Sequence, residues 1–369
     1  MMREEIIACF GVFVVMALSN AIVPVLPLFA SGTTAQGAIY SAYFLGAFLM
    51  VIPSGILSDR IGEAPLIKTG LFLTFISAVL LLVFDNPVFT FTIRLIEGFG
   101  AGFFVASALS LINSSPDHER MSGYFMALLN VGLVAGLIGT GWIVDMSGMP
   151  SSGIIIFGAM SVVSLLAGLF MRQKSRNDVK TVPAEGIPSI SGRLFRILRD
   201  YFWLWVSAVV MIGITGAVTA IYPEFSGFSP HIIGIQIAAM NVATAVSVIL
   251  VSHVHLPPII TIRVAAVLMA IAVMVTFFTP WAFIAVGGIA GIVMIAQLAY
   301  LAQSEVRQGA LMGLFNAASY GGMTILPFVA GYVAENVTFM AAFILTSLFA
   351  LGVAATIGRC GCSEPVRNV

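Results

Sequence analysis

Charged side chains are scarce in this sequence. Asp, Glu, Lys and Arg make up 9% of its 369 residues, whereas 60% are hydrophobic, and the mean hydropathy is +1.08. Soluble domains carry about 25% charged residues, so these charges are too few to cover a surface that faces water. The composition therefore excludes a soluble globular fold and predicts a protein that crosses the membrane many times.

An excess of positive charge is also missing. The 16 Lys and Arg residues balance the 16 Asp and Glu residues, which argues against a nucleic-acid partner. Cys9, Cys360 and Cys362 are too few for a disulfide framework, and the H-x-H pair His253 and His255 is typical of a loop. No pattern resembles a metal cluster, a Ser/His/Asp set or a phosphate-binding loop. We therefore expect no metal, no cofactor and no enzymatic activity.

Long apolar runs are what the sequence has instead. The hydrocarbon core of a bilayer is about 30 Å thick, and a helix needs about 20 apolar residues to cross it. Charged and turn residues divide the chain into twelve such runs, with hairpins expected at SGTTAQG (31–37), FDNPV (84–88) and FTPW (278–281). The expected spans are 6–30, 38–58, 66–84, 88–112, 121–144, 152–171, 201–222, 230–252, 261–278, 281–303, 309–334 and 338–358.

The positive charges predict the orientation of these spans. With the N-terminus in the cytoplasm and strict alternation, fifteen of the sixteen Lys and Arg residues lie on the cytoplasmic side. The outer loops then carry only acids, such as Asp85, Asp145, Glu224 and Glu335. This distribution obeys the positive-inside rule. We therefore expect a multi-pass protein of the cell (cytoplasmic) membrane with both termini in the cytoplasm.

One long polar stretch divides the spans into six and six. We expect an N-terminal bundle over 1–171, a cytoplasmic linker over 172–200, a C-terminal bundle over 201–358 and a cytoplasmic tail over 359–369. The linker contains RLFRILRD, a basic amphipathic segment typical of a helix on the anionic inner leaflet, although we favour a stop-transfer anchor for the seventh span. Because one chain contains both halves of a pathway, we expect it to function as a monomer.

The two halves resemble each other at an offset of 186 residues. The segment ERMSGYFMALLN (119–130) matches EVRQGALMGLFN (305–316), and Gly136 and Gly322 extend the match. Two related halves with a substrate site between them are the plan of many secondary transporters. The expected fold is therefore an all-α integral membrane protein, with twelve transmembrane helices in two pseudo-symmetric six-helix bundles.

The loop between the second and third spans carries a family resemblance. The stretch GILSDRIGEAP (55–65) resembles the signature G-x-L-x-D-R-x-G of the major facilitator superfamily, with matches at Gly55, Leu57, Asp59, Arg60 and Gly62. Within that superfamily, the chain is most similar to the twelve-span drug/proton antiporters. The resemblance implies a cytoplasmic gate. Asp59 would bind the positive N-terminal end of the eleventh span while the cavity faces outward.

The fourth span contains the one basic residue expected at membrane depth. In IRLIEGFGAGFF (93–104), Arg94 and Glu97 are three positions apart, so they share one helical face and can pair. Ionisable groups inside a membrane are costly and point to a function. Arg94, Gly98 and Gly100 fit the superfamily pattern R-x-x-x-G-x-G, which implies that Arg94 and Glu97 couple transport to protons. A permanent salt bridge is the alternative.

Glycines in the fifth span resemble the antiporter pattern of the same superfamily, G-x8-G-x3-G-P-x2-G-G. Four positions match, and Leu137 and Thr140 replace a proline and a glycine. The matching residues are Gly123, Gly132, Gly136 and Gly141. The pattern favours antiport over symport, and its glycines let helices approach closely.

Polar and aromatic residues at mid-span are the candidates for a substrate cavity, although each alone is more often a contact between helices. They are Asn20, Tyr43, Asn130, Gln236, Asn241, Gln297, Tyr300, Asn316 and Tyr320. Asn20 stands where related drug exporters often have an acid, which leaves Glu97 as the main carboxylate candidate. With 28 Phe and 18 Met residues, the cavity is expected to be apolar and adaptable.

These patterns predict a secondary active transporter that works by alternating access. We expect proton-coupled efflux, by antiport, of a small hydrophobic or amphipathic compound. The expected partners are that small-molecule substrate, protons and the lipid bilayer. Two alternatives stay open: a proton symporter or facilitator for a small metabolite such as a sugar, and a transporter-like ligand sensor.

Overall fold

Every regular element in the described part of the chain is a helix. The computed structural model describes residues 2–84, 86–115, 117–171, 198–199, 201–254, 256–302 and 308–359. The elements are α1 (Met2–Ala21), η1 (Val23–Val25), α2 (Leu26–Phe29), α3 (Thr33–Ile61), α4 (Glu63–Val83), α5 (Pro87–Asn113), α6 (His118–Ser147), α7 (Ser152–Leu169), α9 (Phe202–Ser226), α10 (Pro230–Val251), α11 (Pro258–Phe278), α12 (Ala282–Ala302), α13 (Gln308–Asn336), α14 (Phe339–Thr356) and η3 (Ile357–Arg359).

Within these ranges, twelve segments are long and apolar enough to cross a membrane, which confirms the twelve expected spans. The first span consists of α1, η1 and α2 in succession. Pro24 and Pro27 stand at the starts of η1 and α2, where their missing N–H groups interrupt a continuous helix. The chain is therefore a multi-pass membrane protein.

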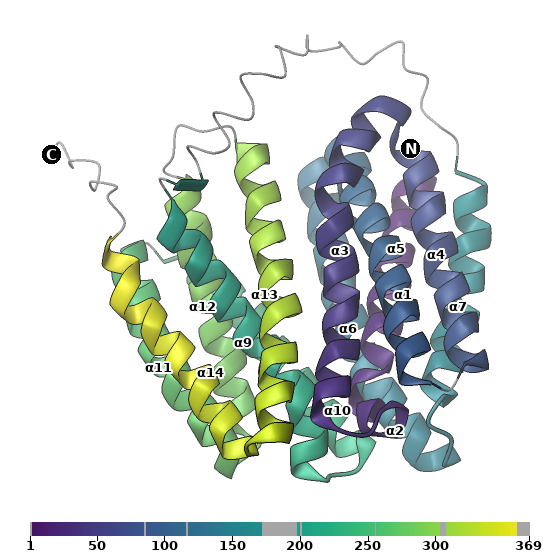
Figure 1. Cartoon of the computed structure of the whole chain (residues 1–369). Helices are drawn as coiled ribbons and strands as arrows, with labels where there is room; N and C mark the ends of the chain where they lie inside the picture. Colours follow the sequence, from purple (N-terminus) through teal and green to yellow (C-terminus); the bar gives the residue numbers. More distant parts are fainter. Residues whose placement is uncertain are drawn as a thin grey trace, which may run out of the picture.

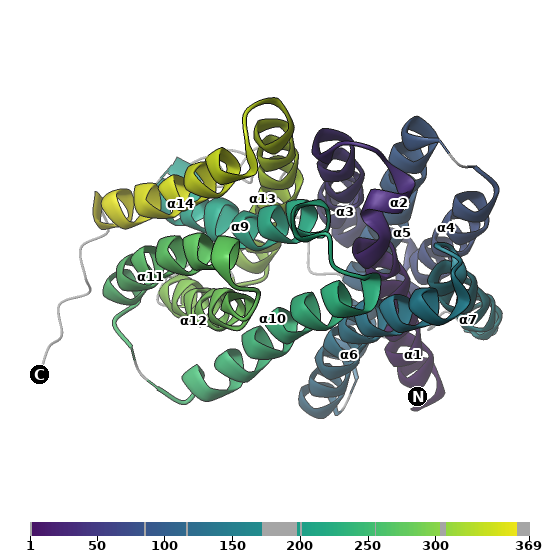
Figure 2. The same ribbon diagram turned by 90° about the horizontal axis from the view of Figure 1, so that it is seen from below.

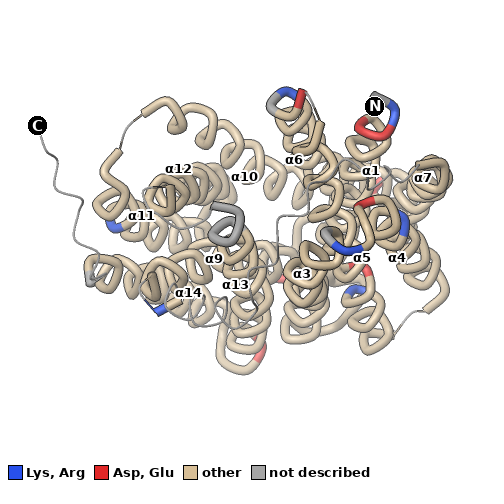
Figure 3. The backbone as a smooth tube through the Cα atoms, turned by 90° about the horizontal axis from the view of Figure 1, so that it is seen from above, with Lys and Arg blue, Asp and Glu red and all other residues tan. Residues whose placement is uncertain are grey.

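The helices form two bundles, as Figures 1 and 2 show. One bundle holds α1 to α7 and the other holds α9 to α14. The first turn of α1 and the end of η3 lie at the same end of the molecule, which we name the terminus end; the opposite end is the far end. Seen from the terminus end, Lys and Arg residues lie at the ends of α1, α4, α6 and α11 (Figure 3). Most of the linker, 172–197 and 200, and the tail, 360–369, lie outside the described residues.

The packing of helices within each bundle follows the sequence repeat. A Cβ at Gly136 of α6 would collide with the backbone carbonyl of Ala17 in α1. A Cβ at Gly322 of α13 would in the same way collide with the carbonyl of Val209 in α9. In each bundle the fifth span therefore packs against the first through a glycine, at positions that the offset of 186 residues relates.

Two expectations about the far end were wrong. The stretch 31–37 is not all hairpin, because α3 already begins at Thr33, directly after Gly32. Asp145, Glu224 and Glu335 do not lie in loops, because α6, α9 and α13 each continue beyond the expected end of the span. The helix ends that carry these three acids contact partners in the opposite bundle. Local charge and turn residues in the sequence do not predict such contacts.

Candidate functional site

A buried ion pair lies inside the N-terminal bundle. Arg94 and Glu97 lie on one face of α5, and Arg94 Nη1 donates to Glu97 Oε2 at 2.6 Å. The side chains are 2% and 0% exposed. A second atom of each group, Arg94 Nε and Glu97 Oε1, is buried with no hydrogen-bond partner among the described residues. The pair is thus neutral as a whole but incompletely satisfied, which is costly in a medium without water.

An aromatic ring from α3 covers the pair. The Arg94 guanidinium lies over the ring of Tyr43, 4.7 Å from its centroid, in a cation–π arrangement. Glycines make this approach possible. A Cβ at Gly98 would collide with the Tyr43 carbonyl, and one at Gly46 would collide with the Leu95 carbonyl. The signature glycine after Arg94 therefore brings α3 and α5 together at the charged pair.

Aromatic contacts connect this pair to the other bundle. The rings of Tyr43 and Phe44 are 5.1 Å apart and meet edge to face, and Tyr40 lies 5.2 Å from Phe44. Phe44 in turn lies 6.4 Å from Tyr320, which belongs to α13 of the C-terminal bundle. Arg94 is therefore separated from the interface between the bundles by two aromatic side chains.

Of the nine cavity candidates, Tyr43 and Tyr320 lie near each other, because the ring of Phe44 contacts both of them. The Asn130 and Asn241 amides donate to carbonyls of their own helices, at Met126 and Ile237.

The remaining candidates are spread over both bundles. Gln297 is fully buried and donates to Ser207 inside the C-terminal bundle, whereas the ring of Tyr300 lies 6.0 Å from that of Tyr201. Asn316 is exposed, Asn20 is half-buried, and Gln236 has a buried amide oxygen without a partner among the described residues.

The antiporter-like glycines of α6 take part in three different contacts. Gly132 and Gly136 lie against backbone carbonyls of α1, at Phe13 and Ala17. Gly141 lies against the carbonyl of Pro230, in α10 of the opposite bundle, while a Cβ at Gly123 would meet nothing within 4 Å. One of the four glycines therefore permits close contact between the two bundles.

The signature loop lies at the terminus end. Gly62 ends α3 with a φ of +87°, a value that favours glycine, and its N–H donates to Ser58. A Cβ at Gly55 would meet nothing within 4 Å, and Arg60 is exposed. The side chains of Asp59 and of residues 308–312 lie outside the described part, so the contact between Asp59 and the start of α13 stays a prediction.

Polar contacts between the bundles lie at the far end, and the sequence had not suggested them. The Thr34 N–H donates to Glu335 Oε2 at 2.8 Å, and the Thr33 hydroxyl donates to the Gly331 carbonyl at 2.8 Å. The Gln36 amide donates to Glu224 Oε2 at 2.8 Å. His231 Nδ1 lies 3.6 Å from Asp145 Oδ2. The only signal in the sequence was three acids near the ends of apolar spans.

Contact between the bundles weakens toward the terminus end. Along the face of α3 that carries Gly37, Phe44 and Phe48, a Cβ at Gly37 would collide with the Pro327 carbonyl, and Phe48 approaches Gly321. On the same face of α3, nearer the terminus end, a Cβ at Gly55 would meet nothing within 4 Å. Among the described residues, contact between the bundles is thus close at the far end and falls off toward the terminus end.

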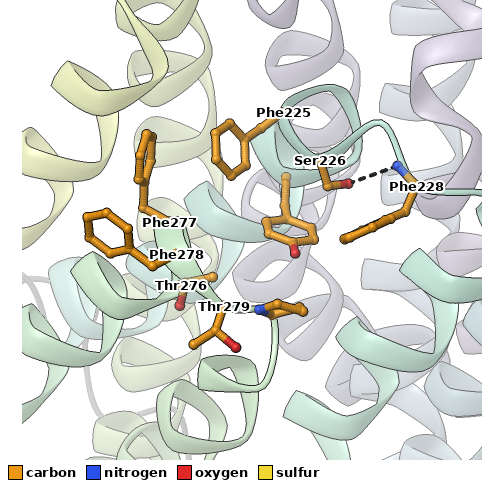
Figure 4. A pocket seen from close by; sticks show the side chains of 9 residues that line it. Phe225, Ser226, Phe228, Thr276, Phe277, Phe278 and Thr279 are labelled. Atoms are coloured by element: carbon orange, nitrogen blue, oxygen red, sulfur yellow. Dashed lines mark hydrogen bonds between the residues drawn. The ribbon is translucent and has the colours of Figure 1, made fainter.

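A cavity of about 180 Å³ lies away from the Arg94–Glu97 pair, at the far end of the C-terminal bundle (Figure 4). Its walls come from the ends of α9 and α11 and from the turns that follow them, and include Phe225, Ser226, Phe228, Phe277, Phe278 and Thr279. None of the cavity candidates lines it. Within the described ranges, no group of three or more His, Cys, Asp or Glu residues is placed to hold a metal ion.

Comparison with known proteins identifies the family. A sequence model described as Major Facilitator Superfamily matches residues 8–306. The chain belongs to the Major Facilitator Superfamily. Membership of this superfamily points to a transporter rather than an enzyme.

Among its relatives in the superfamily is the quinolone resistance protein NorA of Staphylococcus aureus, 27% identical over 143 residues, which are 37% of this chain and 37% of NorA. The multi-drug resistance efflux pump PmrA of Streptococcus pneumoniae is 30% identical over 181 residues, 45% of this chain and 44% of PmrA. The matches thus span less than half the length of either relative.

The fold also matches solved structures of the superfamily. A crystal structure of a mutant of the nucleoside transporter NupG has a TM-score of 0.77 at 15% sequence identity, and the match covers 97% of this chain and 100% of that one. At this identity the likeness supports the fold alone.

Proposed function

We propose that this transporter exports a small hydrophobic or amphipathic compound from the cell in exchange for protons. The single observation that carries the proposal is the buried Arg94–Glu97 pair, which lies two aromatic side chains from the interface between the bundles. The terminus end faces the cytoplasm, the chain lies in the cell membrane, and one copy is sufficient for transport. The two efflux relatives support export, since their names describe drug resistance.

The chemistry of the pair suits proton exchange. A carboxylate at membrane depth is tolerated while Arg94 neutralises it, and it binds a proton when that partner moves away, because an isolated buried charge is costly. The state described by the structure, closed at the far end, has the pair formed. In the opposite state, a proton from outside would neutralise Glu97 and release Arg94 from it.

Alternating access supplies the movement between the two states. The two bundles rock about a site near the midplane, where Phe44 and Tyr320 offer an apolar surface to the substrate. At the terminus end, Asp59 and Arg60 form the cytoplasmic gate, flanked by Gly55 and Gly62. The bundles are the domains 1–171 and 201–358, joined by the cytoplasmic linker 172–200.

Proton release on substrate addition tests this function. Purified wild type in weakly buffered detergent solution is mixed with a panel of lipophilic cations and neutral aromatic drugs, and the pH change is recorded beside the binding isotherm. Glu97→Gln is expected to abolish the release and to keep the binding. Glu63→Gln is the matched control, because Glu63 accepts from Ser110 within one bundle at the terminus end. Binding without proton release in wild type would contradict antiport.

A facilitator or symporter for a small metabolite is the second candidate. The short, fully buried contact between Arg94 and Glu97 would serve equally well as a permanent structural salt bridge. NupG, which has the same fold, is itself a nucleoside transporter. Counterflow of a metabolite in vesicles without a pH gradient, unchanged in Glu97→Gln, would favour this candidate over proton-coupled export.

A further inference from the structure

Three acids at the far end lie where their own helices disfavour them. Asp145, Glu224 and Glu335 lie in the last turns of α6, α9 and α13, which end at Ser147, Ser226 and Asn336. The C-terminal end of a helix is negative, so a carboxylate there destabilises the helix that carries it. Local helix energetics therefore do not account for these residues.

Each acid instead reaches the first turn of a helix in the opposite bundle. Glu335 accepts from the Thr34 N–H, and Glu224 accepts from the Gln36 side chain; both partners lie in the first turn of α3. Asp145 lies 3.6 Å from His231, which follows Pro230 at the start of α10. The first turn of a helix has free N–H groups and a positive dipole end, so it stabilises a carboxylate.

The contact of Glu335 is the most specific of the three. Gly32 precedes α3 with a φ of +84°, and no side chain caps the helix from within its own bundle. A Cβ on Gly32 would lie 2.7 Å and 2.9 Å from the two carboxylate oxygens of Glu335. The glycine therefore leaves open the space that the carboxylate occupies.

Pseudo-symmetry relates the Glu335 and Asp145 contacts. The sequence repeat pairs α6 with α13, so both acids lie at the far ends of equivalent helices. Their partners, α3 and α10, are the second spans of the two bundles. The same device, an acid of the fifth span on the first turn of the second span opposite, thus occurs twice across the interface.

We propose that Glu335 and Asp145 form a two-part latch that holds the far end closed, and that Glu224 strengthens it through Gln36. The proposal rests on the alternating access described above, but not on protons or on any particular substrate. The far end can open only when the carboxylates leave the first turns of α3 and α10. Glu335 is thus a positioning residue for the conformational change, distant from the Arg94–Glu97 pair.

Spin-label distances between the bundles test the latch without substrate. One label pair is placed at the far end, at Met149 and Trp281, and a second at the terminus end, at Ser114 and Ile260; all four positions are exposed, and Cys9, Cys360 and Cys362 are replaced by alanine. In Glu335→Gln, we expect the ratio of far-end-open to far-end-closed molecules to rise about fivefold to tenfold, because a charged contact at a helix N-terminus is lost. The terminus-end distance should shorten in the same molecules.

Two further variants make the test decisive. Gly32→Ala should shift the ratio in the same direction, because the added methyl group displaces the carboxylate. Glu63→Gln, a loss of the same charge at the terminus end, should leave both distance distributions unchanged. The latch is refuted if Glu335→Gln gives wild-type distances, if the far end loosens while the terminus end stays open, or if Glu63→Gln shifts the ratio equally. All these outcomes are independent of the Glu97 proton-release experiment.

Discussion

At the scale of single residues, the contact between Tyr43 and Arg94 gives the buried pair a defined geometry. The guanidinium has one hydrogen-bonded partner, Glu97, and one aromatic partner, and its Nε has no hydrogen-bond acceptor among the described residues. Because so few contacts hold it, the position of Arg94 depends strongly on the ring. Tyr43 also touches Phe44, so a change at the interface between the bundles can reach the pair through packing.

Replacing Tyr43 should therefore impair transport more than it impairs folding. A desolvated cation–π contact is worth about 2 kcal/mol. We expect Tyr43→Ala to lower the initial rate of proton-driven efflux from proteoliposomes about tenfold or more, whereas Tyr43→Phe, which keeps the ring, should lower it by less than about threefold. Equal losses in both variants would show that the hydroxyl, and not the ring, is what matters.

At the scale of helices, glycines determine which spans touch. Along α6, Gly132 and Gly136 meet α1, and Gly141 meets α10 of the other bundle, whereas Gly123 faces open space. A motif that looks uniform in the sequence thus combines contacts within a bundle, a contact between bundles and a position without a close neighbour. The pattern marks a packing surface, and its positions differ in what a larger side chain would displace.

Two alanine variants on α6 should separate these roles. Gly136→Ala should destabilise the protein by about 1–3 kcal/mol, because its Cβ would collide with the rigid backbone of α1 at Ala17. Gly123→Ala should stabilise it by about 0.5–1 kcal/mol, because alanine restricts the unfolded chain and meets nothing in the folded one. Thermal unfolding in detergent, followed by tryptophan fluorescence, measures both. A fall in the midpoint for Gly123→Ala would contradict this assignment.

At the scale of the whole molecule, the proposed alternating access requires the far end and the terminus end to close in turn. The far end is closed by charged and backbone contacts between the bundles. Toward the terminus end, a Cβ at Gly55, on the face of α3 that carries Gly37 and Phe44, would meet nothing within 4 Å. The family resemblance predicts an acid at that end as well, Asp59, for the state in which the terminus end closes. The balance between the two states is then a difference between two sets of weak contacts.

Removing one carboxylate at the terminus end and one at the far end should shift this balance in opposite directions. Asp59→Asn should raise the population that is closed at the far end, because it removes the contact expected to hold the terminus end shut. The double variant of Asp59→Asn with Glu335→Gln should return toward the wild-type ratio, since distant and independent sites add. The label pairs at Met149 and Trp281 and at Ser114 and Ile260 report both effects. A shift in the same direction for both single variants would exclude the reciprocal scheme.

Much of the fold could be predicted from the sequence, but only part of the candidate site. Hydropathy and the distribution of Lys and Arg predict the twelve spans, because insertion into a bilayer depends on those local properties. The Arg94–Glu97 pair also follows from a spacing of three within one helix. The contact between Thr34 and Glu335 could not be predicted, because its partners are 301 positions apart and neither is unusual alone. The covering of Arg94 by Tyr43 likewise depends on how two helices pack.

The contact between Glu335 and the first turn of α3 has one further consequence. Two segments that are remote in the chain, 31–34 and 332–335, lie side by side only while the far end is closed, and Ser31, Tyr332 and Glu335 are exposed there. A binding protein raised against this composite epitope would recognise one conformation and not the other. If the terminus end faces the cytoplasm, such a binder acts from outside the cell and arrests the cycle without entering the substrate path.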